Sequence, residues 1–360
     1  HGIKLVLGYT VEGFKEKDNG VEVLLKDNPS LQADMVVLAI GVTPDTVLAK
    51  EAGLELGIKE SIVVNDRMET SVPDIYAAGD AVQVKHYVTG NDALISLAGP
   101  ANKQGRIIAD NICGGDSRYL GSQGSSVIKV FDMTAATTGI NETNAQKSGL
   151  EVDTVILSSM SHAGYYPGGK VMTMKVIFEK ESYRLLGAQI IGYEGVDKRI
   201  DVLATAIHAG LNATQLKDLD LAYAPPYSSA KDPVNMAGFM IDNIAKGTLK
   251  QWHLEDMDKI SKDKDVVLLD VRTVGEFSRG HIDGFKNIPV DELRERISEI
   301  EKGKPVYLIC QSGLRSYIAS RILEGNGYET YNFSGGFRFY DTVVNDRALI
   351  ERAYACGMDY

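Results

Sequence analysis

The sequence predicts a multidomain protein that combines α/β and α+β folds. Its 360 residues are 44% apolar and 24% charged, which is typical of a folded chain with about two or three domains. Between residues 121 and 245 the predicted strands come first and the helices follow, as in an α+β domain. Around residue 310 an apolar strand, a tight turn and a helix follow one another, which favours an α/β domain.

Composition narrows the function classes. A net charge of -11 and a pI near 5.1 argue against nucleic-acid binding. No apolar run approaches the roughly 18 residues of a membrane span, and the first residues show no basic region followed by an apolar one, so we expect no export signal. The three cysteines, Cys113, Cys310 and Cys356, are too far apart for a disulfide framework or a metal-ligand cluster. We therefore expect a cytoplasmic protein without a metal site, in which Cys113 and Cys356 are packing or bystander residues.

The first forty residues are predicted to be mostly strands. Short apolar runs at 3–7, 11–14 and 21–25 read as strands, with Asp18-Asn19-Gly20 as the turn before the third. The run from 32 to 41 is almost continuously apolar and ends in a glycine turn, so we expect a buried, parallel strand there.

The next region contains a glycine-aspartate turn after a short apolar segment. Residues 75–78 are expected to form a strand that ends at Gly79 and Asp80, followed by Ala81. Such a turn lets backbone approach a phosphate or polyol chain, with the carboxylate accepting from hydroxyls. A helix then begins at Leu97, Ala98 and Gly99 with proline in its first turn. An ordinary turn and an ordinary proline-capped helix are the alternative interpretations.

The middle of the chain alternates strands with turns before two helices. The predicted strands are 126–131, 152–157, 170–178 and 185–192, and the predicted helices are 197–209 and 229–245. Two loops, 161–168 and 223–233, are rich in tyrosine and proline. A tyrosine beside a proline often only covers the edge of a core, so the loops by themselves leave a structural role open.

The sharpest chemical signal is a cysteine between a strand and a helix. The strand at 305–309 leads to Cys310, and helical spacing resumes at Tyr317. Loop N–H groups and the positive end of the helix favour an anion, so Cys310 is predicted to be a nucleophile at neutral pH. Arg315 is expected to add a fixed positive charge. The alternative is a buried structural cysteine at the end of a strand.

Residues upstream of the cysteine favour the first interpretation, because the region resembles a rhodanese (sulfurtransferase) domain. The matching segments are Asp270-Val271-Arg272, Glu276-Phe277, Gly280-His281-Ile282 and Asn287-Ile288-Pro289. The resemblance implies that Cys310 carries sulfur, that Gln311, Ser312, Gly313 and Leu314 cradle the persulfide, and that Asp270 and Arg272 support the loop. Four residues separate Cys310 from Arg315, whereas the related phosphatases have five, so sulfur is the expected cargo.

The region before residue 120 resembles the second half of the FAD domain of flavin-dependent pyridine nucleotide-disulfide reductases. The resemblance rests on Ala39-Ile40-Gly41-Val42-Thr43-Pro44 and on Ile75-Tyr76-Ala77-Ala78-Gly79-Asp80. It implies that Asp80 binds the ribityl group and that the helix from Leu97 points its amino end at the flavin pyrimidine. The implied cofactor-binding residues are Gly79, Asp80, Ala81, Leu97, Ala98 and Gly99.

The tyrosine loops narrow the resemblance to the coenzyme A disulfide reductases. In that branch one tyrosine from each of two such loops, the second from the other subunit of a homodimer, flanks the substrate sulfur. The matching positions are Tyr165 and Tyr223, with Tyr166 and Tyr227 as alternatives. Their implied role is to donate O–H bonds to a thiolate leaving group. His162 has no evident partner and is expected to be structural.

Together these segments resemble the coenzyme A disulfide reductase–rhodanese fusions, including NADH-dependent persulfide reductases. The implied domains are 1–27 (tail of an NAD(P)H-binding domain), 28–120 (second half of an FAD-binding, Rossmann-like domain), 121–245 (dimerisation) and 246–360 (rhodanese). The implied cofactors are FAD, NADH or NADPH, and coenzyme A, with coenzyme A-bound or inorganic sulfane sulfur as substrate. No G-x-G-x-x-G motif is present, so we expect these residues to be the carboxy-terminal part of a longer polypeptide.

Two other functions remain open from the sequence. An NADH oxidase or peroxidase would use the same glycine-aspartate segment but would leave Cys310 without a task. Alternatively, the rhodanese domain would be an accessory module that binds or senses sulfur, with an unreactive Cys310.

Overall fold

The computed structural model describes residues 3–355 and divides into two compact units. One unit takes in the chain up to Thr43 and from Tyr340 onward, and the other runs from Pro44 to Phe339. Each is described by itself. None of the helices within residues 3–355 is both long and apolar enough to cross a bilayer.

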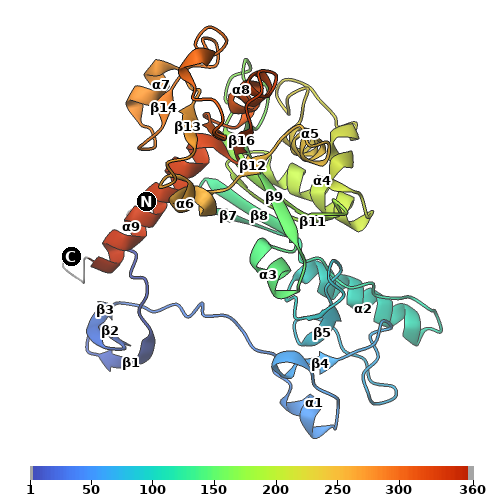
Figure 1. Cartoon of the computed structure of the whole chain (residues 1–360). Helices are drawn as coiled ribbons and strands as arrows, with labels where there is room; N and C mark the ends of the chain where they lie inside the picture. The colour runs from blue at the N-terminus through green and yellow to red at the C-terminus, as the bar shows by residue number, and fades with distance from the viewer. Residues whose placement is uncertain (1–2, 356–360) are drawn as a thin grey trace. The chain divides into compact units, whose positions relative to one another are not determined.

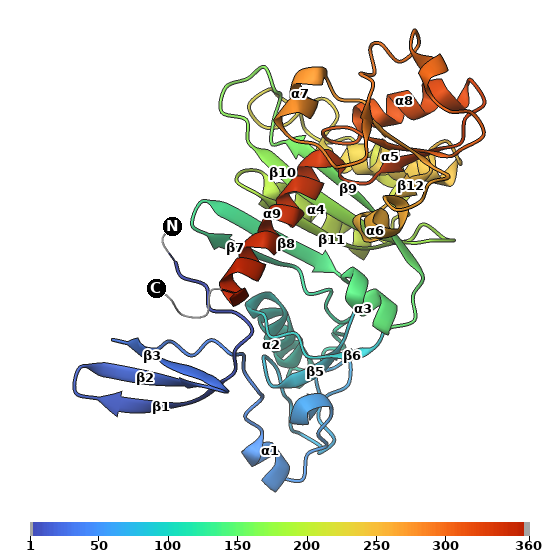
Figure 2. The same ribbon diagram turned by 60° about the vertical axis from the view of Figure 1, so that its left-hand side comes forward.

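The first unit contains a three-stranded antiparallel sheet (Figure 2). Its strands are β1 (Val11–Lys17), β2 (Gly20–Leu25) and β3 (Asn28–Ala33). Lys17 pairs with Gly20 across the Asp18-Asn19 turn. Gly20 has φ +131° and an added Cβ would lie 2.4 Å from the Ala33 carbonyl oxygen, so the turn needs glycine.

Two strand predictions in this unit are wrong. Residues 3–7 and 34–41 form no strand, although β3 takes up the start of the predicted run at 32–41. The apolar side chains of the second segment are exposed, Val37 to 76% and Ile40 to 91%. A buried parallel strand needs neighbours on both sides to complete its ladder. No strand of residues 3–355 pairs with this segment.

The second unit begins with a small region before residue 120. Its helices are α1 (Val47–Glu51), the 3₁₀ turn η1 (Ile58–Glu60) and α2 (Ala98–Ile112), and its strands are β4 (Ile62–Val63), β5 (Val82–Lys85) and β6 (Asp92–Ala93). Met68, Val82 and Val84 form its buried core. The strand expected at 75–78 is only a bridge between Tyr76 and Glu69. The helix predicted from Leu97 is confirmed as α2.

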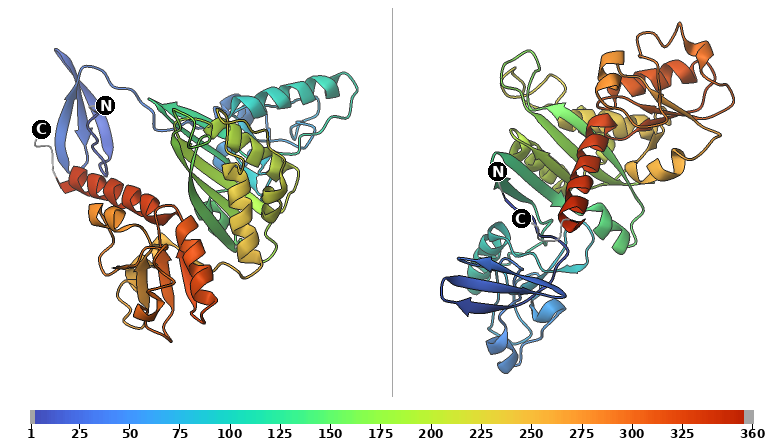
Figure 3. Two further views of the ribbon diagram at one scale, coloured as in Figure 1. Left: turned by 90° about the horizontal axis from the view of Figure 1, so that it is seen from above. Right: turned by 90° about the vertical axis from the view of Figure 1, so that its left-hand side faces the viewer.

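The middle of the second unit is an antiparallel sheet covered on one face by two helices (Figure 3). The strand order is β7-β8-β11-β10-β9. The elements are β7 (Ser126–Val130), β8 (Met133–Gly139), α3 (Glu142–Lys147), β9 (Val152–Met160), β10 (Val171–Glu179), β11 (Leu185–Gly192), α4 (Val196–His208), η2 (Ala213–Asp218) and α5 (Pro233–Ala245). The predicted α+β order is confirmed, with β8, α3 and η2 as additions.

The last part of the second unit is a parallel sheet with helices around it (Figure 1). The strand order is β12-β16-β15-β13-β14. The elements are β12 (Gln251–Trp252), η3 (Leu254–Asp256), α6 (Met257–Ile260), β13 (Val267–Asp270), α7 (Val274–Arg279), β14 (Lys286–Asn287), η4 (Ile297–Glu299), β15 (Val306–Ile309), α8 (Leu314–Glu324), β16 (Thr330–Phe333) and the start of α9 (Gly336–Ala355). From Tyr340 onward, α9 belongs to the first unit. Leu269 and Asp270 of β13 are buried, as are all residues of β15 except Tyr307.

Side chains of this last part cover the open edge of β9. The Ile156 N–H donates to Ser334 Oγ at 3.1 Å, and Gln251 Nε2 donates to the Thr154 carbonyl at 2.8 Å. An uncovered edge strand would present unpaired backbone groups. The joint between the sheets is therefore a specific contact.

A glycine at the start of α9 supports the turn after β15. Gly336 has φ +71°, and an added Cβ would lie 2.7 Å from Ser312 N and 2.8 Å from the Cys310 carbonyl oxygen. The next residue, Phe337, donates its N–H to that carbonyl at 2.7 Å. Only glycine allows the two backbone segments to approach so closely.

We predict that Gly336→Ala distorts this turn and destabilises the second unit by about 2 kcal/mol or more, since the methyl group would overlap backbone on both sides. Gly303→Ala is the matched control. Gly303 also has positive φ, +86°, but its added Cβ would meet open space. Gly303→Ala should therefore lower the free energy of unfolding by only the roughly 1 kcal/mol of backbone strain. Thermal unfolding of both variants measures the difference, and equal losses would contradict the steric argument.

Candidate active site

Cys310 lies at the carboxyl end of β15, where the chain turns into α8. The side chain is 1% exposed. Gly313, with φ +98°, donates its N–H to Cys310 Sγ at 3.1 Å. The Ser316 hydroxyl lies 3.2 Å from Sγ and 3.1 Å from the Gly313 carbonyl oxygen, so its single hydrogen can turn to the sulfur when the sulfur is anionic.

The turn around the sulfur is held from a neighbouring strand and from α9. Asn332, on β16, donates from Nδ2 to the Gly313 carbonyl at 3.2 Å, and Arg338 donates its backbone N–H to the Gln311 carbonyl at 3.2 Å. The 11-residue helix α8 begins at Leu314, so its positive end faces the thiol. The fixed N–H, the hydroxyl and the helix end together stabilise negative charge on Sγ.

The four residues expected to cradle a persulfide differ in how they meet the sulfur. Gly313 contacts it through its N–H, while Gln311 and Ser312 form the backbone that packs against Gly336. Leu314 is 55% exposed at the start of α8. Sequence reasoning missed Ser316, although a small hydroxyl residue in the first turn of the helix is a visible signal. It also missed Asn332, which no local pattern marks.

The positive charge expected of Arg315 is held in place by a carboxylate. Its Nη1 and Nη2 donate to Oε2 and Oε1 of Glu276, each at 2.7 Å. This hydrogen-bonded pairing with Arg315 lowers the pKa of Glu276 to about 2, and bonds from Thr273 add to the effect. The two opposite charges compensate each other beside the turn.

Asp270 and Arg272 form a second ion pair, in which the two charges compensate each other. Both are buried, and Arg272 Nη2 donates to Asp270 Oδ2 at 2.6 Å and to the Gly280 carbonyl at 2.8 Å. The guanidinium lies 3.8 Å from the centre of the Phe337 ring. These contacts tie β13 to α7 and α9, which fits the supporting role expected of the pair.

The two tyrosine-rich loops meet within one protomer. Tyr165 Oη and Tyr223 Oη lie 2.8 Å apart, and both side chains are exposed, to 76% and 45%. The hydrogen bond that Tyr223 shares with Tyr165 raises the pKa of Tyr223. The pair therefore forms without a contribution from a second subunit.

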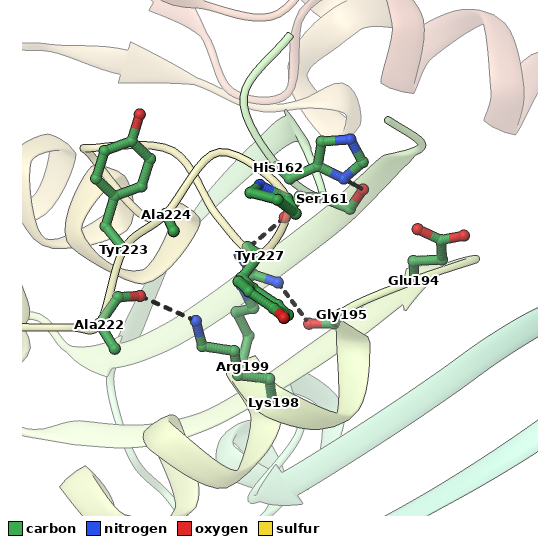
Figure 4. Close-up of a pocket in the computed structure, with 11 residues that line it drawn as sticks. Ser161, His162, Glu194, Gly195, Lys198, Arg199, Ala222, Tyr223, Ala224 and Tyr227 are labelled. Atoms are coloured by element: carbon green, nitrogen blue, oxygen red, sulfur yellow. Dashed lines mark hydrogen bonds between the residues drawn. The ribbon is translucent and has the colours of Figure 1, made fainter. Parts of the chain in front are cut away.

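A cavity of about 520 Å³ adjoins Tyr223 and is drawn in Figure 4. Lys198 and Glu194 bring charge to its lining, and Lys198 Nζ donates to the Ala222 carbonyl at 3.3 Å. Tyr227 also lines the cavity, at 72% exposure. His162 has partners after all, Ser161 Oγ at 3.2 Å and the Pro167 carbonyl at 3.2 Å, which fits a structural role.

A buried arginine joins the two loops beneath the tyrosines. Arg199, on α4, is 1% exposed and pairs with Asp232, the N-cap of α5, at 2.9 Å. The same Nη2 lies 3.0 Å from the Ser161 carbonyl and 3.1 Å from Ser228 Oγ. One guanidinium thus holds the start of the first loop and the second half of the second, which sequence reasoning did not single out.

The predicted flavin-binding residues lie in the turn at Gly79 and at the start of α2. The Gly79 N–H donates to Oε1 of the buried Gln104, on α2, at 2.8 Å, so the turn and the helix are held together. Asp80 is exposed beside this turn. Leu97 is the N-cap of α2 and makes no side-chain cap bond, so the first N–H groups of the helix stay open to a ligand. An exposed carboxylate and an uncapped helix start fit the ribityl and pyrimidine parts of FAD.

The predicted site residues therefore form three groups. Among the described residues, no hydrogen bond or ring contact joins Cys310 to either tyrosine. Cys113 is exposed just after α2, and Cys356 lies outside the described residues. Residues 3–355 bring no three histidine, cysteine or carboxylate side chains together as metal ligands.

Three family models match the chain in succession. Residues 1–105 match the pyridine nucleotide-disulphide oxidoreductases, 125–233 match the dimerisation domain of that family, and 253–341 match rhodanese-like domains. The "NAD(P)H sulfur oxidoreductase (CoA-dependent)" of Pyrococcus furiosus is 38% identical over 214 residues, which is 59% of this chain and 48% of that protein. The chain thus spans about half the length of this relative.

Two solved structures match more of the chain. The reduced CoADR-RHD of Bacillus anthracis is 47% identical with a TM-score of 0.90, over 94% of this chain and 60% of that one. The NAD-dependent persulfide reductase from A. fulgidus is 41% identical with a TM-score of 0.83, over 92% and 61%. From these matches and the fold, the chain belongs to the pyridine nucleotide-disulphide oxidoreductases and carries a rhodanese-like domain.

Proposed function

We propose that the protein uses NADH or NADPH and FAD to reduce coenzyme A disulfide, persulfide or polysulfide, and that Cys310 carries sulfane sulfur. The observation that carries this proposal is the buried Cys310 Sγ with the Gly313 N–H and the Ser316 hydroxyl directed at it. The NADH oxidase alternative gives these fixed donors no purpose. The similarity to a persulfide reductase and to a coenzyme A-dependent sulfur oxidoreductase adds support.

The geometry of the turn supports a role for Cys310 in sulfur transfer. The thiolate attacks the outer sulfur of a persulfide, a new S–S bond forms, and the donor leaves as a thiol with its proton. The product is a persulfide anion on Cys310. The Gly313 N–H, the Ser316 hydroxyl and the positive end of α8 stabilise that charge before and after transfer.

FAD would be held by Gly79, Asp80, Ala81, Leu97, Ala98 and Gly99. The flavin would supply the transfer of electrons from the nicotinamide to a disulfide. The chain's own residues then bind and orient: the uncapped start of α2 favours negative charge near its N–H groups, and Asp80 accepts from hydroxyls.

The tyrosine pair would act on the coenzyme A thiolate. Tyr165 and Tyr223 share a hydrogen bond, which uses the hydrogen of one hydroxyl. The hydrogen of the other hydroxyl remains available to an acceptor on the substrate. The pair therefore presents one proton to a leaving thiolate. The adjoining cavity with Lys198 offers room for the rest of the substrate.

A homodimer working in the cytoplasm completes the proposal. The sheet face opposite α4 and α5 exposes Ile128 to 60% and Ile191 to 51%. These residues border a shallow cavity with Thr173 and Gln189. Such a face suits the contact expected of a dimerisation domain.

We predict that Cys310→Ser lowers the rate of sulfur transfer from a persulfide to cyanide by about a hundredfold or more, because a hydroxyl cannot replace the nucleophilic sulfur. Cys113→Ser is the control, since this thiol is exposed after α2 and outside the turn. Thiocyanate formation measures the rate. Transfer by Cys310→Ser at the wild-type rate would leave the rhodanese-like domain as a binding or sensing module.

For the tyrosine pair we predict that Tyr165→Phe and Tyr223→Phe each lower kcat for coenzyme A disulfide by about tenfold or more. The double variant should be no slower than the slower single variant, because the two hydroxyls act as one donor. Tyr183→Phe, whose ring stacks on Phe178 and does not line the cavity, should keep its activity. Unaltered turnover of both single variants would contradict the donor role.

Arg199→Lys is predicted to destabilise the fold by about 2–3 kcal/mol, since a lysine cannot make the forked bonds to Asp232 and both loops. It should also lower kcat for coenzyme A disulfide, through displaced tyrosines, while sulfur transfer at Cys310 stays unchanged. Arg184→Lys, at a half-exposed ion pair, is the control. If both activities fell together, Arg199 would be a general stabiliser and not a positioning residue for the tyrosines.

A further inference from the structure

The charges around Cys310 are balanced in a way that bears on which sulfur donors can enter. The turn itself, from Gln311 to Leu314, has no ionisable side chain. The cation that follows it, Arg315, is joined by two 2.7 Å bonds to the carboxylate of Glu276, on α7. The side chains are only 31% and 22% exposed, so solvent screens this pair incompletely.

The Glu276 carboxylate is fixed in place from two sides. Its Oε2 accepts from the Thr273 N–H at 3.0 Å and from the Thr273 hydroxyl at 2.9 Å, within a capping box at the start of α7. The same oxygen accepts from Arg315. The carboxylate therefore cannot swing away to free the guanidinium for an incoming anion, and it stays ionised across the working pH range because its pKa is about 2.

We propose that Glu276 is a specificity-determining residue that cancels the charge of Arg315 and so disfavours dianionic sulfur donors at Cys310 relative to persulfides of lower charge. The hydrogen-bond donors at the turn, the Gly313 N–H and the Ser316 hydroxyl, stabilise one negative charge, that of the thiolate or persulfide on Sγ. Thiosulfate brings two more charges. With Arg315 engaged, the cation that would offset them is already paired, and the nearby carboxylate repels the dianion.

Both reactions balance without an added oxidant or reductant. With thiosulfate, the Cys310 thiolate attacks the outer sulfur, the S–S bond breaks, and sulfite leaves as a dianion. With an organic persulfide, the same attack releases a thiol that keeps the proton. Each leaves a persulfide anion on Cys310, so the two donors differ in the charge brought to the site and not in the bond formed.

The proposal rests on the proposed sulfur transfer at Cys310, and a charge series of variants tests it in the full chain. Glu276→Gln leaves the pair with a net positive charge, Arg315→Gln leaves it negative, and the double variant restores neutrality. We expect the ratio of kcat/KM for thiosulfate to kcat/KM for the persulfide of 2-mercaptoethanol, which has no carboxylate, to rise about five- to tenfold in Glu276→Gln and to fall in Arg315→Gln. The double variant should return to the wild-type ratio.

Glu299→Gln provides the matched control. Glu299 is also paired with an arginine, Arg296, and its pKa is likewise about 2, but it lies in η4, away from the turn. In Glu299→Gln the ratio of kcat/KM for the two sulfur donors should stay at the wild-type value. If Glu276 served only to join α7 to α8, Glu276→Gln would slow both donors equally and the ratio would not move, which would overturn the proposal.

A second measurement separates this proposal from the proposed function. Iodoacetamide and iodoacetate alkylate Cys310 by the same displacement but differ by one negative charge, and mass spectrometry reports the rate at the Cys310 peptide. The rate ratio of the neutral to the anionic reagent should fall about five- to tenfold in Glu276→Gln. An unchanged alkylation ratio defeats the charge filter. A changed ratio without sulfur transfer from either donor in the wild type defeats only the proposed function.

Discussion

Burying a sulfur anion requires donors that are already in place. Cys310 is almost fully buried, and an uncompensated charge there would cost several kcal/mol. Much of the surrounding structure serves this requirement: β15 delivers the thiol to the sheet edge, Gly313 turns its N–H toward the sulfur, and α8 begins directly behind it. Gly336 then lets α9 close over the turn.

Compensated charge is a recurring device in the second unit. Arg199 with Asp232 holds the tyrosine loops, Arg272 with Asp270 supports the turn from below, and Arg315 with Glu276 borders it. A buried ion pair by itself adds little to the free energy of unfolding, because the cost of desolvating both charges offsets their attraction. The planar fork of an arginine, however, fixes several backbone carbonyls at once. These pairs set geometry where loops have to be held in one arrangement.

The sequence could predict what depends on neighbours along the chain. The apolar runs of β9, β10 and β11, the proline start of α2, and the strand, turn and helix around Cys310 all have local signals. The run at 32–41 shows the limit: its pattern predicted a buried strand, yet a strand exists only if others complete its ladder. No such partner is present among the described residues.

Contacts between distant segments could not be predicted from spacing. Glu276 and Arg315 are separated by 39 positions, and Asn332 reaches Gly313 from another strand. Spacing along the chain therefore indicated the positive charge of Arg315 but not the Glu276 carboxylate that pairs with it. The loops that carry Tyr165 and Tyr223 are likewise joined by Arg199, which the sequence presents only as one more helical residue.

The most direct test of the account is the anaerobic stoichiometry of the intact natural protein with NADH and coenzyme A persulfide. The account predicts that NADH is consumed without oxygen and that one sulfide is released for each NADH oxidised, as reduction of one S–S bond requires. Consumption of NADH only after oxygen is admitted, with no sulfide released, would contradict it and favour an oxidase.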